Sequence, residues 1–150
     1  MPKQQRLVTR GRHTELPIEG SLLAEVCLAT DRLVVLVFRD AVGNEAEVTV
    51  EDKIVLVRGT DERVLEGSRT GTSFNPRGLH PLVDLLGCRV SEAIAQYTGE
   101  LRITFADGLV LQVASTTGYE AWHFTKPRPG RPIGGSGPHI GITGAAGHLN

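Results

Sequence analysis

The chain has 150 residues, the size of one ordinary domain, and 40% of them are apolar, so it can build a sizeable core. This composition excludes a fully disordered chain, and the longest apolar run, Leu33 to Phe38, is too short to span a membrane. The formal net charge of −1 hides an uneven distribution, because residues 13–124 hold all 17 acidic residues and only nine of the 16 basic ones. Such basic ends are typical of solvated tails that keep a small domain soluble; the alternatives are that the acidic body faces a basic partner or that the ends contact phosphate.

The cysteines and the N-terminus indicate the compartment. The basic N-terminus is not followed by the apolar stretch of a secretion signal. Cys27 and Cys88 are too few for a disulfide framework, and no further ligands stand near them at metal spacing. We therefore expect two buried, reduced cysteines, a cytoplasmic protein, no membrane contact, and neither a metal ion nor another cofactor.

Composition also predicts the domain boundaries. Residues 1–15 are predicted to be a flexible basic N-terminus, and residues 16–124 to be the folded domain. Residues 125–150 contain seven glycines and four prolines, and they are predicted to be a largely flexible basic tail. Within that tail, only 140–142 is a candidate strand.

The body is predicted to be mainly β. Apolar residues alternate with polar ones, or form short continuous runs, in a series of segments bounded by turn residues. The predicted strands are 22–29, 33–38, 45–51, 54–57, 64–65, 90–96, 101–105, 109–113 and 119–124.

One short helix is predicted at about 79–86. Leucine and valine recur there at helical spacing, Pro81 lies in the first turn, and Gly87 follows the last leucine. A helix of two turns is not stable alone, so we expect it to dock on the sheets.

The register of the last predicted hairpin follows from its residues. A two-residue turn at Asp107–Gly108 would place Gln112 on the apolar face. A three-residue turn, 106–108, pairs Phe105 with Leu109 and makes every residue on that face apolar. Because a slip of one residue exchanges the two faces, we predict the three-residue turn.

The two halves of the body are similar to each other. The run from Val34 to Asp40, followed by Gly43 and an alternating strand, parallels the run from Leu101 to Asp107, followed by Gly108 and another such strand. The first copy has two extra residues in its turn. We predict two related antiparallel meander units packed together, with the helix between them.

The same residues resemble a family of short actinobacterial proteins known as a domain of unknown function. The resemblance rests on Leu85-Leu86-Gly87, on the hairpin Phe105-Ala106-Asp107-Gly108-Leu109-Val110-Leu111-Gln112-Val113, and on Tyr119-Glu120-Ala121-Trp122. It covers about residues 16–124 and implies a fold; it supplies no catalytic or binding residues.

No residue pattern indicates catalysis, so we favour a small non-enzymatic interaction protein that acts through its acidic β domain. One form is an immunity- or antitoxin-like protein that covers a basic enzyme, contacting it through sheet edges and the acidic strand. The candidate interface consists of Glu45, Glu47, Glu51 and Asp52.

Two alternatives remain open. A ligand-binding or catalytic site would lie near Glu120, Trp122 and His123, where a carboxyl group beside an indole ring could act as an acid. A weak association with nucleic acid, which the composition makes less favourable, would use Lys126, Arg128 and Arg131. The oligomeric state is left open.

Overall fold

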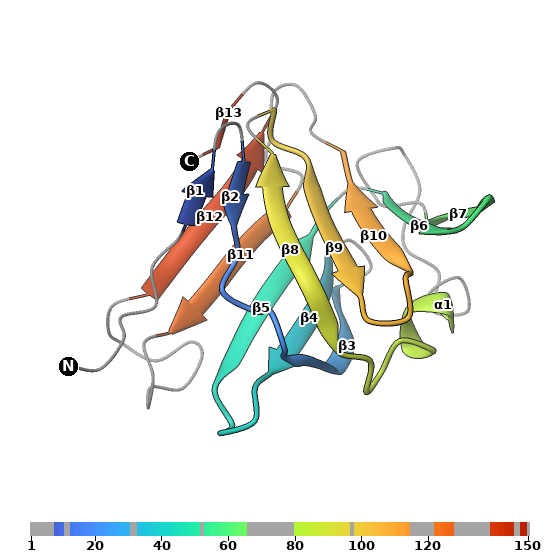
Figure 1. Ribbon diagram of the computed structural model, residues 1–150, viewed down its shortest axis with the longest axis horizontal. Helices are drawn as coiled ribbons and strands as arrows, with labels where there is room; N and C mark the ends of the chain where they lie inside the picture. The colour runs from blue at the N-terminus through green and yellow to red at the C-terminus, as the bar shows by residue number, and fades with distance from the viewer. Residues whose placement is uncertain are drawn as a thin grey trace.

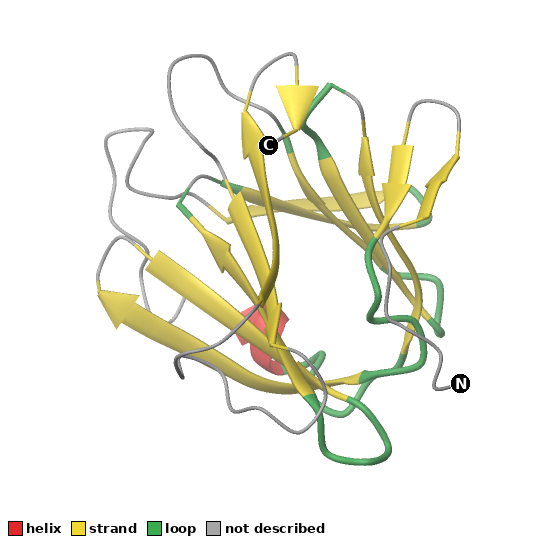
Figure 2. Ribbon diagram, turned by 90° about the vertical axis from the view of Figure 1, so that its left-hand side faces the viewer, coloured by secondary structure: helices red, strands yellow, loops and turns green. Residues whose placement is uncertain are grey.

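The described residues form two antiparallel sheets that pack face to face, with one short helix beside them (Figures 1 and 2). The structure is a computed structural model. It describes residues 8–10, 13–30, 33–51, 53–65, 80–96, 98–114, 122–127, 139–145 and 148–149.

Each sheet contains a meander and strands from elsewhere in the chain. Within the described ranges, sheet A has seven strands in the order β1 (Val8–Arg10), β2 (His13–Glu15), β8 (Val90–Gln96), β9 (Leu101–Phe105), β10 (Val110–Val113), β6 (Ile54–Arg58) and β7 (Asp61–Leu65). Sheet B has six, in the order β13 (His148–Leu149), β12 (His139–Ala145), β11 (Trp122–Pro127), β5 (Glu45–Val50), β4 (Leu33–Arg39) and β3 (Leu22–Thr30). The prediction of a mainly β fold built on two antiparallel meanders is confirmed, with β3–β5 in sheet B and β8–β10 in sheet A.

The two halves exchange strands. After the meander β3–β5 the chain crosses to sheet A, where β6 pairs with β10. After the meander β8–β10 it crosses back to sheet B, where β11 pairs with β5. Each half therefore completes the sheet of the other half, and neither sheet consists of one half alone.

Reciprocal hydrogen bonds join the two meanders where β3 and β8 begin. The Leu23 amide donates to the Cys88 carbonyl at 3.0 Å, and the Val90 amide donates to the Ser21 carbonyl at 2.8 Å. Leu23 and Val90 occupy equivalent places in the two halves, because each opens its meander opposite a phenylalanine. Such an exchange of partners is what a two-fold relation between the halves produces.

A second reciprocal pair lies in the turns that lead into these strands. The Gly20 amide donates to the Val90 carbonyl, and the Gly87 amide donates to the Leu23 carbonyl, both at 2.8 Å. Gly20 and Gly87 both have φ of 85°, a left-handed conformation that side chains disfavour. The internal similarity predicted from sequence thus extends to the backbone.

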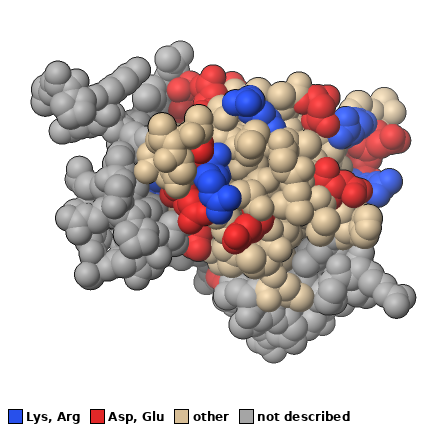
Figure 3. All heavy atoms as spheres, turned by 90° about the horizontal axis from the view of Figure 1, so that it is seen from below, with Lys and Arg blue, Asp and Glu red and all other residues tan. Residues whose placement is uncertain are grey.

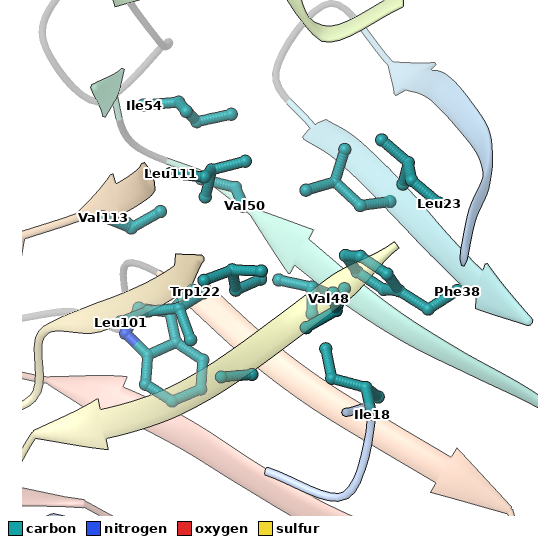
Figure 4. Close-up of a cluster of buried hydrophobic side chains, with 14 of the residues drawn as sticks. Ile18, Leu23, Phe38, Val48, Val50, Ile54, Leu101, Leu111, Val113 and Trp122 are labelled. Atoms are coloured by element: carbon teal, nitrogen blue, oxygen red, sulfur yellow. The ribbon is translucent and has the colours of Figure 1, made fainter. Parts of the chain in front are cut away.

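The core lies between the two sheets and draws equally on both halves. Figure 4 shows Val48 and Val50 of β5, Leu111 and Val113 of β10, and Trp122 of β11 directed into the same interior. All five are buried. The alternating strand pattern therefore sends one side chain in two into this core.

The predicted register of the second hairpin is confirmed. The Phe105 amide donates to the Leu109 carbonyl at 2.8 Å, and Leu111 pairs with Ile103. Gly108 closes the three-residue turn at φ of 94°. In the first hairpin Gly43 has the same φ, but the strands are longer, so the extra residues extend the strands instead of enlarging the turn.

Two local predictions need correction. The helix α1 (His80–Val83) is shorter than the predicted 79–86, because the chain tightens after Val83 into bonds such as Leu86 amide to Val83 carbonyl. Cys27 is exposed, whereas burial was expected. The cause is a bulge in β3 between Leu23 and Glu25. The bulge exchanges the inward and outward sides for the residues that follow it, so Cys27 faces outward.

The predicted domain boundaries do not coincide with the ends of the sheets. β1 and β2 precede residue 16, β11 continues to Pro127, and β12 and β13 follow residue 125. β12 contains the candidate strand 140–142, and β11 overlaps the predicted strand 119–124. The strands β1, β2 and β13 were not predicted, because segments of two or three residues are too short to show an apolar periodicity. Backbone pairing with neighbouring strands forms them nevertheless.

Candidate functional site

The outer face of sheet B brings together carboxylates from two strands. The register places Glu25 of β3 opposite Val37 of β4, Val37 opposite Glu47 of β5, and Glu47 opposite Thr125 of β11. These four side chains form a row across the sheet, on the side away from the core. We call Glu25, Glu45 and Glu47 the acidic face.

Glu45 is the first residue of β5 and lies at one end of the acidic face. It lies two residues before Glu47 on the same strand, so both side chains point outward. Its Oε2 accepts from Nε of Arg39 at 3.0 Å, and this contact raises the pKa of the Arg39 guanidinium. One acid of the face therefore has a basic partner across the strand pair.

Glu47 is the member of the acidic face whose ionised form is disfavoured by its surroundings. Partial burial raises the pKa of its carboxyl, and the negative charges of Glu45 and Glu25 raise it further. Val37, only 6% exposed, adds an apolar neighbour between Glu25 and Glu47. The ionised form of Glu47 is thus disfavoured, and a cation brought to this face would stabilise it.

The structure places the other predicted interface residues differently. Glu51 directly follows β5, is half-buried and has an interaction partner of its own. Asp52 lies outside the described residues. β5 is an interior strand between β4 and β11, so a partner can reach its outward side chains but not its backbone. Glu25 was missed because the bulge in β3 hides which of its residues face outward.

The residues of the predicted ligand site do not converge. Trp122 is 1% exposed and points into the core, where its Nε1 donates to the Gly99 carbonyl at 2.7 Å. His123 is exposed on the opposite side of β11, opposite Thr49 on the outer face of sheet B. Glu120 lies outside the described residues.

The predicted basic contacts give a similar result. Lys126 is only 4% exposed, and its Nζ donates to the Pro17 carbonyl at 2.7 Å. Burial lowers the pKa of its ammonium, which the nearby Asp40 partly offsets. Lys126 is therefore engaged inside the fold, which corrects its prediction as a surface contact. Arg128 and Arg131 lie outside the described residues.

Charges elsewhere on the described surface are mixed. Figure 3 views the molecule from below and shows acidic and basic side chains interspersed among other residues. The ion pairs outside the acidic face include that of Arg58 with Asp107 at 2.8 Å. Within the described ranges, no three potential ligands gather as a metal site, and no helix is long and apolar enough to cross a membrane.

The fold and this face define a small two-sheet β protein with an acidic outer face on one sheet. Residues 14–140 match the family of unknown function DUF6188, and the chain belongs to that family. No curated protein and no solved structure matches the chain. The resemblance to a family of unknown function is confirmed at this level; the motifs quoted for it and an actinobacterial origin stay predictions.

Proposed function

We propose that the protein is a non-enzymatic interaction module that binds a basic protein through the acidic face of sheet B. An immunity- or antitoxin-like role, in which the domain covers a basic enzyme, is the concrete form of this proposal. The partner would place lysine or arginine side chains opposite Glu25 and Glu47.

The state of Glu47 is the observation that carries the proposal. Its carboxyl is partly desolvated and lies near two other acids. Like charges held together on a sheet cost stability, and binding of opposite charge removes that cost. The arrangement thus favours a cationic partner over an anionic one.

The described residues give less support to the two alternatives. Of the three residues predicted to contact nucleic acid, the structure describes Lys126. Its ammonium is not available for such a contact, because it donates to the Pro17 carbonyl. A ligand site would need Trp122 and His123 together, and they lie on opposite faces of β11.

The test is affinity capture from lysate of the native host with three forms of the full-length chain. These are the unchanged protein, the double variant Glu25→Gln/Glu47→Gln, and the matched control Glu62→Gln/Glu92→Gln on sheet A. We expect a basic protein to be retained at low salt by the first and the third form and to be lost from the second. High salt should release it.

Two results would contradict the proposal. One is retention of the same protein by the Glu25/Glu47 variant. The other is an eluate dominated by nucleic acid, which would transfer the function to the basic ends of the chain.

A further inference from the structure

A cavity lies in the second half of the molecule, among the β6–β7 hairpin, α1 and the turn between β9 and β10. Its volume is about 210 Å³, which is smaller than the roughly 300–1,000 Å³ of sites for drug-sized ligands. It fits one unbranched side chain. The described residues that line it are apolar on the inside, with Leu56, Leu85 and Leu109. The charged residues among them are Asp61, Asp84, Arg63 and Arg58, and the guanidinium of Arg58 is paired with the carboxylate of Asp107 outside the cavity lining.

The other half shows what occupies the equivalent place there. Leu56 of β6 pairs with Leu111 of β10, and Phe124 of β11 pairs with Val48 of β5, so Leu56 and Phe124 occupy equivalent positions in the two halves. Two residues further along each strand, the equivalent positions are Arg58 and Lys126. The turn that Lys126 reaches, at Pro17, corresponds to the turn at Asp84 that borders the cavity. In the other half, the buried side chain of Lys126 therefore lies at the place that corresponds to the cavity.

The two basic side chains behave differently. Lys126 lies buried with its ammonium on the Pro17 carbonyl. Arg58 instead extends outward to the carboxylate of Asp107 at 2.8 Å and leaves the cavity open. Within the described part of the chain, no backbone N–H donates to the carbonyl of Asp84, the counterpart of the Pro17 carbonyl.

We propose that this cavity binds a primary ammonium group on an unbranched aliphatic chain. The leucines would pack against the methylene groups, as apolar surface does around a lysine stem. The Asp84 carbonyl and the carboxylates of Asp61 and Asp84 would accept from the ammonium, with charge-assisted bonds. A lysine side chain of a partner and a free alkylamine share this chemistry. The proposal does not depend on the acidic face.

The experiment is a ¹⁵N-resolved NMR titration of the full chain. The probes are n-butylammonium, cadaverine and Nα-acetyl-lysine methylamide, with 1-butanol and butyrate as the uncharged and oppositely charged controls. We expect saturable shifts at the amides of Leu56, Leu85 and Leu109 with the ammonium probes, and weaker shifts with butanol. Tighter binding of the lysine derivative than of cadaverine would indicate a partner side chain, and the reverse a free amine.

Variants show whether the cavity itself binds the probes. Asp61→Asn with Asp84→Asn is expected to weaken binding about fivefold, while Glu92→Gln, on the outer face of sheet A, leaves it unchanged. Arg58→Lys supplies the chain that the other half already has, so it should occupy the cavity and abolish butylammonium binding. Preference for butyrate, the lack of saturable shifts, or indifference to both sets of substitutions would overturn the proposal.

Discussion

At the scale of single residues, Glu47 shows a conflict between stability and the proposed function. Its raised pKa means that the folded protein binds the proton more tightly than the unfolded chain. The free energy of unfolding therefore falls as pH rises through the folded pKa, and the ionised carboxylate destabilises the free protein at pH 7. A charged residue that lowers the stability of the unbound protein can be retained where binding of a partner needs that charge.

The substitution Glu47→Gln removes this charge. We expect it to raise the free energy of unfolding at pH 7 by about 0.2–1 kcal/mol, the range of cross-strand charge effects. The gain should shrink below the ordinary pKa of 4.5, where the carboxyl is protonated in both states. Urea unfolding at the two pH values measures it, with Glu92→Gln as the control. Destabilisation at pH 7 would show that the carboxylate is well accommodated.

Trp122 is the second residue with a specific prediction. Its indole donates to the Gly99 carbonyl inside the core. Trp122→Phe keeps an aromatic ring but leaves that buried carbonyl without its partner, which costs about 1–3 kcal/mol. Denaturant unfolding followed by circular dichroism measures the loss. No change in the midpoint would mean that water replaces the indole.

At the scale of elements, the two turns that enter β3 and β8 are equivalent. Gly20 and Gly87 share the same φ, and a methyl group at either would meet no atom within 4 Å. Gly20→Ala and Gly87→Ala should therefore each cost about 1–2 kcal/mol through backbone strain alone, and by similar amounts. Thermal or urea unfolding tests this. A large loss at one site and none at the other would contradict the equivalence of the turns.

Sequence was sufficient for elements whose side chains are consistent with one register. In the second hairpin every residue on the inner face is apolar only with the three-residue turn, and the structure has that turn. It was insufficient for β3, where the bulge after Leu23 changes the inward face without any marker residue. Glu25 therefore could not be assigned to the acidic face, although Glu45 and Glu47 could be.

At the scale of the whole molecule, the exchange of β6 and β11 makes the halves interdependent. Alternating patterns predict which side chains of a strand face inward, but they do not specify a neighbouring strand. The pairing of β6 with β10, and of β11 with β5, depends on contacts far apart in the chain.

This interdependence predicts the behaviour of fragments. If the chain is cut between Leu65 and His80, each fragment lacks strands that complete its sheet, so each alone should be largely unfolded. Mixed in equal amounts, they should associate and recover native circular dichroism and the fluorescence of Trp122, the single tryptophan. Independent folding of either fragment would contradict the exchange.

The most direct measurement for the proposed function is carboxylate-to-amine cross-linking of the full chain in lysate of its native host. A zero-length reagent joins an acid only to a lysine in direct contact with it. Trypsin releases the segment from Asp40 to Lys53, which carries Glu45 and Glu47, so mass spectrometry can locate the bond. We predict cross-links from Glu47 in this segment to lysines of one basic protein. Cross-links to a partner that involve only acids outside sheet B would contradict the account.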